Sequence, residues 1–154
     1  RGLRPLYLIH GDEPLLAQEA ADAIRAAARA AGHTEREVFV ASGAHFDWSG
    51  VLGAAQEMSL FAERKLIEIR IPSGKPGKEG SEALQRYCER LSDDVLTLVQ
   101  CPRLDFQQLK AAWFGALDAG GLVVRVETLE QLADAFPLAI GQGLLEGEEQ
   151  LIEL

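Results

Sequence analysis

The sequence predicts a three-layer α/β fold in which five parallel strands form one sheet flanked by helices. Short apolar runs rich in β-branched residues alternate along the chain with segments whose apolar residues recur at helical spacing. Such alternation is typical of parallel sheets with right-handed crossovers. We expect the strands at residues 6–9, 38–40, 66–71, 95–99 and 122–126.

Helices are expected between and after these strands. Asp12 suits the N-cap of the first helix and Gly32 its C-terminal end. Trp113 and Phe114 lie on the fourth helix and are expected to pack against the sheet. Residues 73–80, rich in Gly, Pro and Lys, predict a solvated loop. The expected helices are residues 13–31, 47–55, 79–91, 106–119 and 129–136.

Composition indicates a soluble protein with a core of its own. The chain has 154 residues, 47% of them hydrophobic, and a net charge of −9, which argues against a free-standing nucleic-acid binder. No apolar run approaches the length of a membrane span, so we expect a cytoplasmic protein. Cys88 and Cys101 are expected to be buried free thiols. The chain opens on Arg1 rather than Met, so we expect a fragment or a chain trimmed at its N-terminus.

The turn after the first strand, HGDEPLL at residues 10–16, is where a nucleotide would sit in an α/β protein. A phosphate-binding loop needs several glycines and a Lys followed by Ser or Thr, and this turn has one Gly and no Lys. Asp12 and Glu13 would repel phosphate, and we expect them to cap the first helix instead. We therefore expect no cofactor. A P-loop-like nucleotide-binding enzyme domain stays open as the alternative.

Other chemistry has little support in the sequence. A phospho-acceptor domain would need an Asp after the third strand and a Lys after the fifth, and neither is present. His10, His33 and His45 lie on separate turns, so we expect exposed or capping histidines and no metal site. No catalytic residue is predicted, and this shifts the interpretation from catalysis to binding.

The segment Gln56-Glu57-Met58-Ser59-Leu60-Phe61, here called the anchor segment, has the composition of a binding peptide. Its apolar side chains can fill pockets while the Gln fixes register. If the anchor segment is exposed it indicates a partner, and if it is buried it is ordinary core. Arg64 and Lys65 follow it and are expected to be solvated charges that complement an acidic partner.

Four stretches together resemble the delta subunit of the bacterial DNA polymerase III clamp loader, over about residues 5–135. They are LYLIHGDEPLL at 6–16, FDW at 46–48, QEMSLFAERKLIEIRIP at 56–72 and QLKAAWFGAL at 108–117. The resemblance implies a P-loop, AAA+-like domain without functional ATP binding, which agrees with the turn after the first strand. It also implies a non-catalytic subunit of a DNA-directed DNA polymerase holoenzyme, a nucleotidyltransferase complex that acts in DNA replication.

The resemblance further implies a partner. Subunits of this family bind the ring-shaped sliding clamp, the beta subunit, and hold it open at one interface. The family's clamp-binding element falls on Gln56, Met58, Ser59, Leu60 and Phe61, with Leu60 and Phe61 as anchors and Gln56 at the pocket rim. Other clamp-loader subunits are implied as partners of the full-length protein, DNA is contacted only through the assembled complex, and no membrane is involved.

Two regions are predicted. Residues 1–135 form the AAA+-like domain with its degenerate nucleotide loop and carry the anchor segment. Residues 136–154, which are acidic and interrupted by glycines, form a short irregular or helical tail that is a linker or a partial lid domain. The tail also fits the start of another domain, or two segments that are numbered continuously. We expect this chain to lack the domains that assemble a loader.

Overall fold

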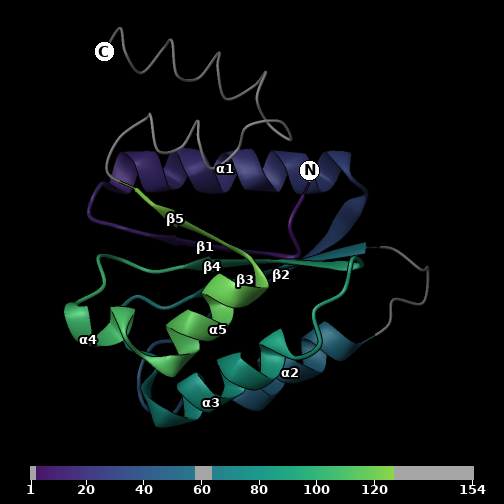
Figure 1. The fold of residues 1–154 in the computed structure, drawn as a ribbon. Coiled ribbons are helices and arrows are strands. Elements are labelled where there is room, and N and C mark those ends of the chain that lie inside the picture. Colours follow the sequence, from purple (N-terminus) through teal and green to yellow (C-terminus); the bar gives the residue numbers. More distant parts are fainter. Residues whose placement is uncertain (1–2, 58–63, 127–154) are drawn as a thin grey trace, which may run out of the picture.

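The computed structural model describes residues 3–57 and 64–126, which form a parallel five-stranded sheet with helices on both faces (Figure 1). The strand order is β2-β3-β4-β1-β5, and each neighbouring pair is parallel. This confirms the predicted three-layer α/β fold. The elements are β1 (Leu6–His10), α1 (Pro14–Ala30), β2 (His33–Val40), α2 (Trp48–Gln56), β3 (Arg64–Arg70), α3 (Gly77–Cys88), β4 (Val95–Gln100), α4 (Phe106–Leu109), α5 (Ala112–Gly120) and β5 (Leu122–Arg125).

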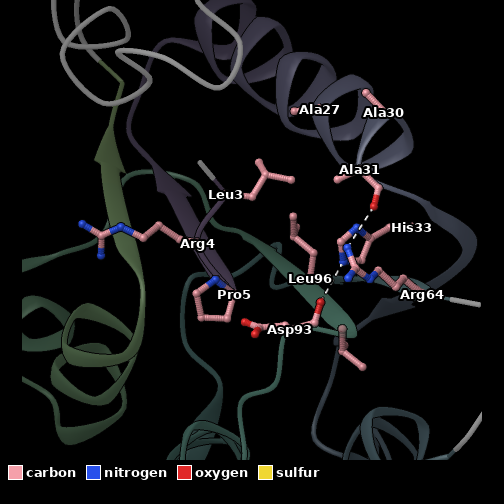
Figure 2. A pocket seen from close by; sticks show the side chains of 11 residues that line it. Leu3, Arg4, Pro5, Ala27, Ala30, Ala31, His33, Arg64, Asp93 and Leu96 are labelled. Carbon is pink, nitrogen blue, oxygen red and sulfur yellow. Dashed lines mark hydrogen bonds between the residues drawn. The ribbon is translucent and has the colours of Figure 1, made fainter. Parts of the chain in front are cut away.

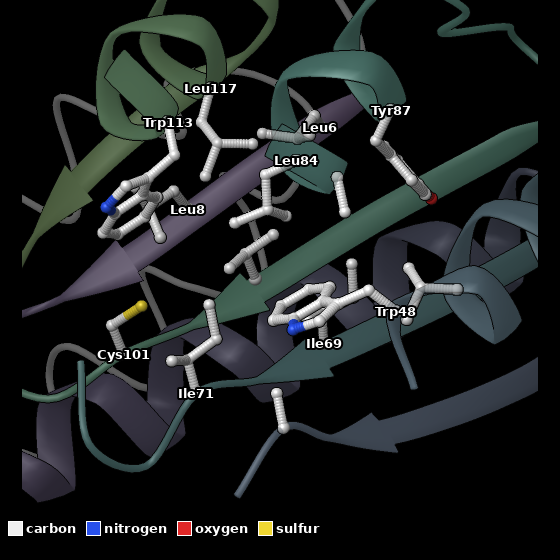
Figure 3. Packing of buried hydrophobic residues seen from close by; sticks show 14 of the residues in the cluster. Leu6, Leu8, Trp48, Ile69, Ile71, Leu84, Tyr87, Cys101, Trp113 and Leu117 are labelled. Carbon is white, nitrogen blue, oxygen red and sulfur yellow. The ribbon is translucent and has the colours of Figure 1, made fainter. Parts of the chain in front are cut away.

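The sheet separates two apolar cores because successive side chains of a strand point to opposite faces. On β1, Leu6 and Leu8 join the core beneath α2, α3 and α5, whereas Tyr7 and Ile9 join the core beneath α1. Figure 3 shows the first core, where Trp113 lies close to Leu8. Strands buried on both faces read as continuous apolar runs, which is why the sequence located them.

Strand β2 differs from its prediction as a buried strand over residues 38–40. It is longer, running from His33 to Val40, and it forms one edge of the sheet. Val38 and Val40 face the α1 side and are 39% and 46% exposed. In the described part of the chain α1 is the helix on that face, and its apolar core lies over β1 and β4 rather than over the β2 edge.

The expected helix over residues 106–119 is two helices. Ala111 has extended backbone angles, φ −71° and ψ 152°, and separates α4 from α5. The break allows Trp113 to be buried in the core while its indole N–H donates to Gln108 Oε1 at 3.0 Å. Phe106, on α4, stays exposed. Burial of the indole with its N–H satisfied therefore overrides the continuous helical pattern. The packing prediction is confirmed for Trp113, and Phe114 is half-buried against the same core.

The predicted loop over residues 73–80 is shorter than expected, because α3 begins at Gly77. Gly80 is buried, and a Cβ there would lie 2.7 Å from Pro76 Cβ and 2.8 Å from the Trp48 indole. This glycine therefore serves close packing between α2 and α3 and is not a loop residue.

The two cysteines were expected to be buried free thiols. Cys101 is buried and Cys88 half-buried, and both are free thiols. Burial raises the pKa of Cys101 to about 12 and of Cys88 to about 11.

The predicted helix over residues 129–136 and the tail over 136–154 lie outside the described residues. None of the described helices is long and apolar enough to cross a bilayer.

Candidate functional site

The turn after β1 is shaped by packing. Gly11 has φ +144°, and a Cβ on it would lie 2.6 Å from the carbonyl oxygen of Val126. The glycine is therefore required by the close approach of the chain that follows β5. The expected cap by Asp12 is wrong: Glu13 holds the N-cap position without a side-chain cap hydrogen bond, and Asp12 lies 3.8 Å from the Arg103 guanidinium.

A depression of about 510 Å³ opens at this turn, between the carboxyl ends of β1, β4 and β5. Its charges are mixed, since Asp12 and Asp105 face it together with Arg103 and Arg125. The lining includes no lysine. Within residues 3–57 and 64–126, no three His, Cys, Asp or Glu side chains are grouped to hold a metal ion. This arrangement offers little to a triphosphate, which needs backbone N–H groups and concentrated positive charge.

The three histidines have three different environments. His45 is exposed, as expected. His33 is buried, and its ring lies 3.3 Å from the carbonyl oxygens of Ala28 and Asp93, so it caps the last turn of α1. His10 is also buried and meets Phe114 edge-on at 5.6 Å between ring centroids, so the prediction of an exposed or capping residue is wrong there.

The anchor segment begins where α2 ends. Gln56 is the last residue of α2, and its side chain is exposed. Glu57 follows with extended angles, φ −71° and ψ 124°, so the chain leaves the helix axis at this point. Met58, Ser59, Leu60 and Phe61 lie outside the described residues, and their expected roles stay predictions.

The chain returns to the described structure at Arg64, the first residue of β3, and two basic side chains tie this point to the helices. Arg64 Nη1 donates to the carbonyl oxygen of Ala31, at the end of α1, at 3.1 Å. Lys65 Nζ donates to the carbonyl oxygen of Ala54, in the last turn of α2, at 3.2 Å. Consecutive strand residues point to opposite faces, so the pair caps one helix on each side of the sheet.

Lys65 is the residue whose environment differs most from expectation. It is 6% exposed, whereas the sequence predicted a solvated charge. Its ammonium lies 3.4 Å from Glu37 Oε1 and 4.0 Å from Glu57 Oε2 in addition to its bond to Ala54. A buried ammonium needs such partners, and here they join α2, β2 and β3 around one charge.

On the other face, Arg64 lines a second depression of about 500 Å³ at the amino ends of the strands (Figure 2). His33 and Asp93 line it as well, joined by the hydrogen bond drawn in Figure 2. Its apolar walls come from Leu3, Ala27 and Leu96. Two of its polar side chains, His33 and Arg64, contact carbonyl oxygens at the end of α1, which indicates a structural role for them.

Glu68 is a fully buried carboxylate in the middle of β3. It accepts two hydrogen bonds from Arg25 at 2.9 Å, one from Arg36, and one from Arg70 at 3.3 Å. Burial alone would raise the pKa of this carboxyl, but the hydrogen bonds from Arg25 and Arg36 outweigh it and lower the pKa to about 2. The cluster therefore holds α1 and the edge strand β2 against β3.

Sequence reasoning missed both Lys65 and Glu68. For Glu68 a signal existed, because a lone acid between Ile67 and Ile69 in an otherwise apolar strand has to be paired if the strand is buried. For Lys65 the sequence gives no such signal, since the residue follows Arg64 at the start of a strand and resembles an exposed pair.

These features define a class of protein: an α/β domain with a parallel sheet, whose nucleotide-type turn lacks the groups for phosphate and whose candidate binding segment joins α2 to β3. The family model for the DNA polymerase III delta subunit matches residues 7–127. The chain therefore belongs to the DNA polymerase III delta subunit family.

Individual relatives agree with this assignment. The chain is 38% identical over 130 residues to DNA polymerase III subunit delta of Escherichia coli, which covers 84% of this chain and 38% of that protein. It is 27% identical over 118 residues to the Haemophilus influenzae subunit, covering 77% of this chain and 34% of that protein. The solved Bacillus subtilis DNA clamp loader delta protein shares the fold, with a TM-score of 0.60, 18% identity, and coverage of 86% of this chain and 41% of that one.

Proposed function

We propose that this chain binds a ring-shaped sliding clamp through the anchor segment and, as part of a delta subunit, helps to open the ring. One observation carries the proposal: in a chain of the delta family, an exposed Gln56 at the end of α2 is followed, after Glu57, by Met58-Ser59-Leu60-Phe61. Leu60 and Phe61 serve as apolar anchors, Met58 and Ser59 add contacts, and Gln56 hydrogen-bonds at the rim of the clamp pocket.

The wider assignments follow from the same proposal. The chain is a non-catalytic subunit of a cytoplasmic DNA polymerase holoenzyme, it meets the other clamp-loader subunits in the longer protein, and it reaches DNA only through the assembled complex. The net charge of −9 supports a protein rather than DNA as the direct partner. Residues 1–135 form one AAA+-like domain with a degenerate nucleotide loop, and residues 136–154 are a linker or a partial lid domain.

The experiment is a binding titration of the chain against a bacterial sliding clamp, with the double variant Leu60→Ala/Phe61→Ala. Each anchor contributes roughly 1.5–3 kcal/mol when buried, so the double variant is expected to bind about 100-fold more weakly or worse. The melting temperature of the double variant should stay within about 2 °C of the parent, because these side chains are proposed to lie at the surface.

A matched control is Phe106→Ala, which removes another exposed phenylalanine from a different part of the surface. It should leave clamp affinity unchanged. If Leu60→Ala/Phe61→Ala binds the clamp as the parent does, the two residues are not anchors and the proposal fails. If the double variant mainly lowers the melting temperature, the two residues belong to the core and the proposal fails as well.

A further inference from the structure

We infer that Lys65 is a positioning residue for clamp binding: its buried ammonium ties the two flanks of the anchor segment together and so sets the direction in which Gln56 is presented. This inference rests on the proposed function. Lys65 does not touch the clamp in this scheme, because 6% exposure leaves little of it to contact a partner.

A side-chain hydrogen bond connects the two flanks of the anchor segment. Lys65 Nζ lies 3.2 Å from the carbonyl oxygen of Ala54, eleven residues earlier in the chain. That carbonyl is in the last turn of α2, where helix carbonyls lack intrahelical partners. The backbone N–H of Glu57 donates to the neighbouring carbonyl oxygen, that of Gly53, at 3.0 Å. Together these bonds occupy two of the last four carbonyls of α2 and hold the turn that ends at Gln56.

Lys65 is also attached to the sheet. Its backbone N–H donates to the carbonyl oxygen of Asp94 at 2.9 Å, and it pairs with Val95 in the β3–β4 register. Its side chain also meets Glu37 of β2 at 3.4 Å. The amine therefore links the end of α2 to β2, and the backbone of Lys65 links the same residue to β4. Lys65 thus connects the end of α2, where the anchor segment begins, to the point where the described chain resumes at β3.

The charge of the Lys65 ammonium is balanced by its neighbours. A buried ammonium beside helix carbonyls is favourable because it meets the negative end of the helix dipole, and Glu37 and Glu57 supply the compensating charge. Removal of the amine leaves Ala54 without this donor and leaves two carboxylates near the helix end. Both changes loosen the exit from α2, and a binding element with loosened flanks pays a larger ordering cost when it binds.

The test compares Lys65→Met with Lys78→Met in clamp titrations. Lys78 is exposed near the start of α3, which follows the opposite end of β3. Because each variant replaces one lysine by methionine, both change the net charge by the same amount. We expect Lys65→Met to weaken clamp binding roughly ten-fold, toward the affinity of a free synthetic peptide of residues 55–63, and Lys78→Met to bind as the parent does. The affinity of the peptide itself gives the limit without positioning.

A double-mutant cycle separates positioning from general loss of stability. If Lys65 acts through Gln56, then Gln56→Ala should cost less affinity in the Lys65→Met background than in the parent. Glu37→Gln, which removes one carboxylate from the amine without touching the segment, is a second variant and should weaken binding by a smaller factor. Circular dichroism at the titration temperature establishes that each variant is folded.

The outcomes distinguish the two proposals. If Leu60→Ala/Phe61→Ala binds normally, the proposed function itself fails. If the parent binds through those anchors but Lys65→Met and Glu37→Gln both match Lys78→Met, the positioning role is wrong and the proposed function stands. Equal costs of Gln56→Ala in both backgrounds would also overturn the inference.

Discussion

Glu68 allows a direct test of how the α1 face of the sheet is stabilised. The substitution Glu68→Gln keeps the shape of the side chain but removes the charge that Arg25, Arg36 and Arg70 share. The pKa of Glu68 falls from its ordinary value of 4.5 to about 2 in the folded protein. At about 1.4 kcal/mol per pKa unit, this difference favours the folded state by roughly 3 kcal/mol.

Solvent reduces that figure. The side chains of Arg36 and Arg70 are 49% and 41% exposed, so part of their attraction to the carboxylate is screened. We therefore expect Glu68→Gln to lower the free energy of unfolding by about 2 kcal/mol at pH 7. Urea unfolding followed by far-UV circular dichroism measures this. The control Glu82→Gln, at an exposed glutamate on α3, should change the free energy of unfolding by less than about 0.5 kcal/mol.

The pH dependence has a definite sign. The folded pKa lies below the unfolded value, so the ionised carboxylate favours folding, and its contribution is complete above pH 4.5 and is lost as the pH falls toward about 2. The difference between the parent and Glu68→Gln should therefore shrink steadily between about pH 5 and pH 2. A difference below about 0.5 kcal/mol at pH 7, or one that stays constant with pH, would refute this account of the cluster.

Two further predictions concern the nucleotide-type turn and the interior. Titration calorimetry with ATP and Mg²⁺ should show no binding, because the turn after β1 lacks lysine and carries Asp12 and Glu13; micromolar affinity would restore the nucleotide-binding alternative. Tyr87→Phe should lower the free energy of unfolding by about 1–2 kcal/mol, since the phenol is hydrogen-bonded to the buried Thr97 hydroxyl. The cost of Tyr87→Phe should be smaller in a Thr97→Val background, and equal costs would mean that the two hydroxyls do not depend on each other.

The central strands were predictable because a strand that is buried on both faces consists of a continuous run of mostly apolar residues. Val95 to Val99 and Leu6 to Ile9 are apolar on both faces, and the structure places them in the middle of the sheet. Strand order and edge position are different, since they depend on which strands meet in space. Val38 and Val40 have the same composition as the central strands and yet lie at an exposed edge.

The candidate site shows the same division. The anchor segment could be recognised from its residue types and from family resemblance, and Gln56 is exposed as a binding role requires. The partners of Lys65 could not be recognised, because Ala54 and Glu37 come close to it only after α2 and β2 have packed against β3. The break at Ala111 could not be recognised either, because the sequence pattern of residues 106–119 is that of one helix. The extended backbone of Ala111 divides this pattern into two helices, and Trp113 is buried.

The strand order also has a geometric consequence. Strand β3 begins at Arg64 next to one edge of the sheet, whereas β5 ends at Arg125 at the other edge (Figure 1). Three strand spacings and one strand length separate these corners by roughly 20–25 Å. The diagonal between them crosses β4 and β1, the strands with apolar cores on both sides. The two corners are therefore connected through the strands that are packed against helices on both faces.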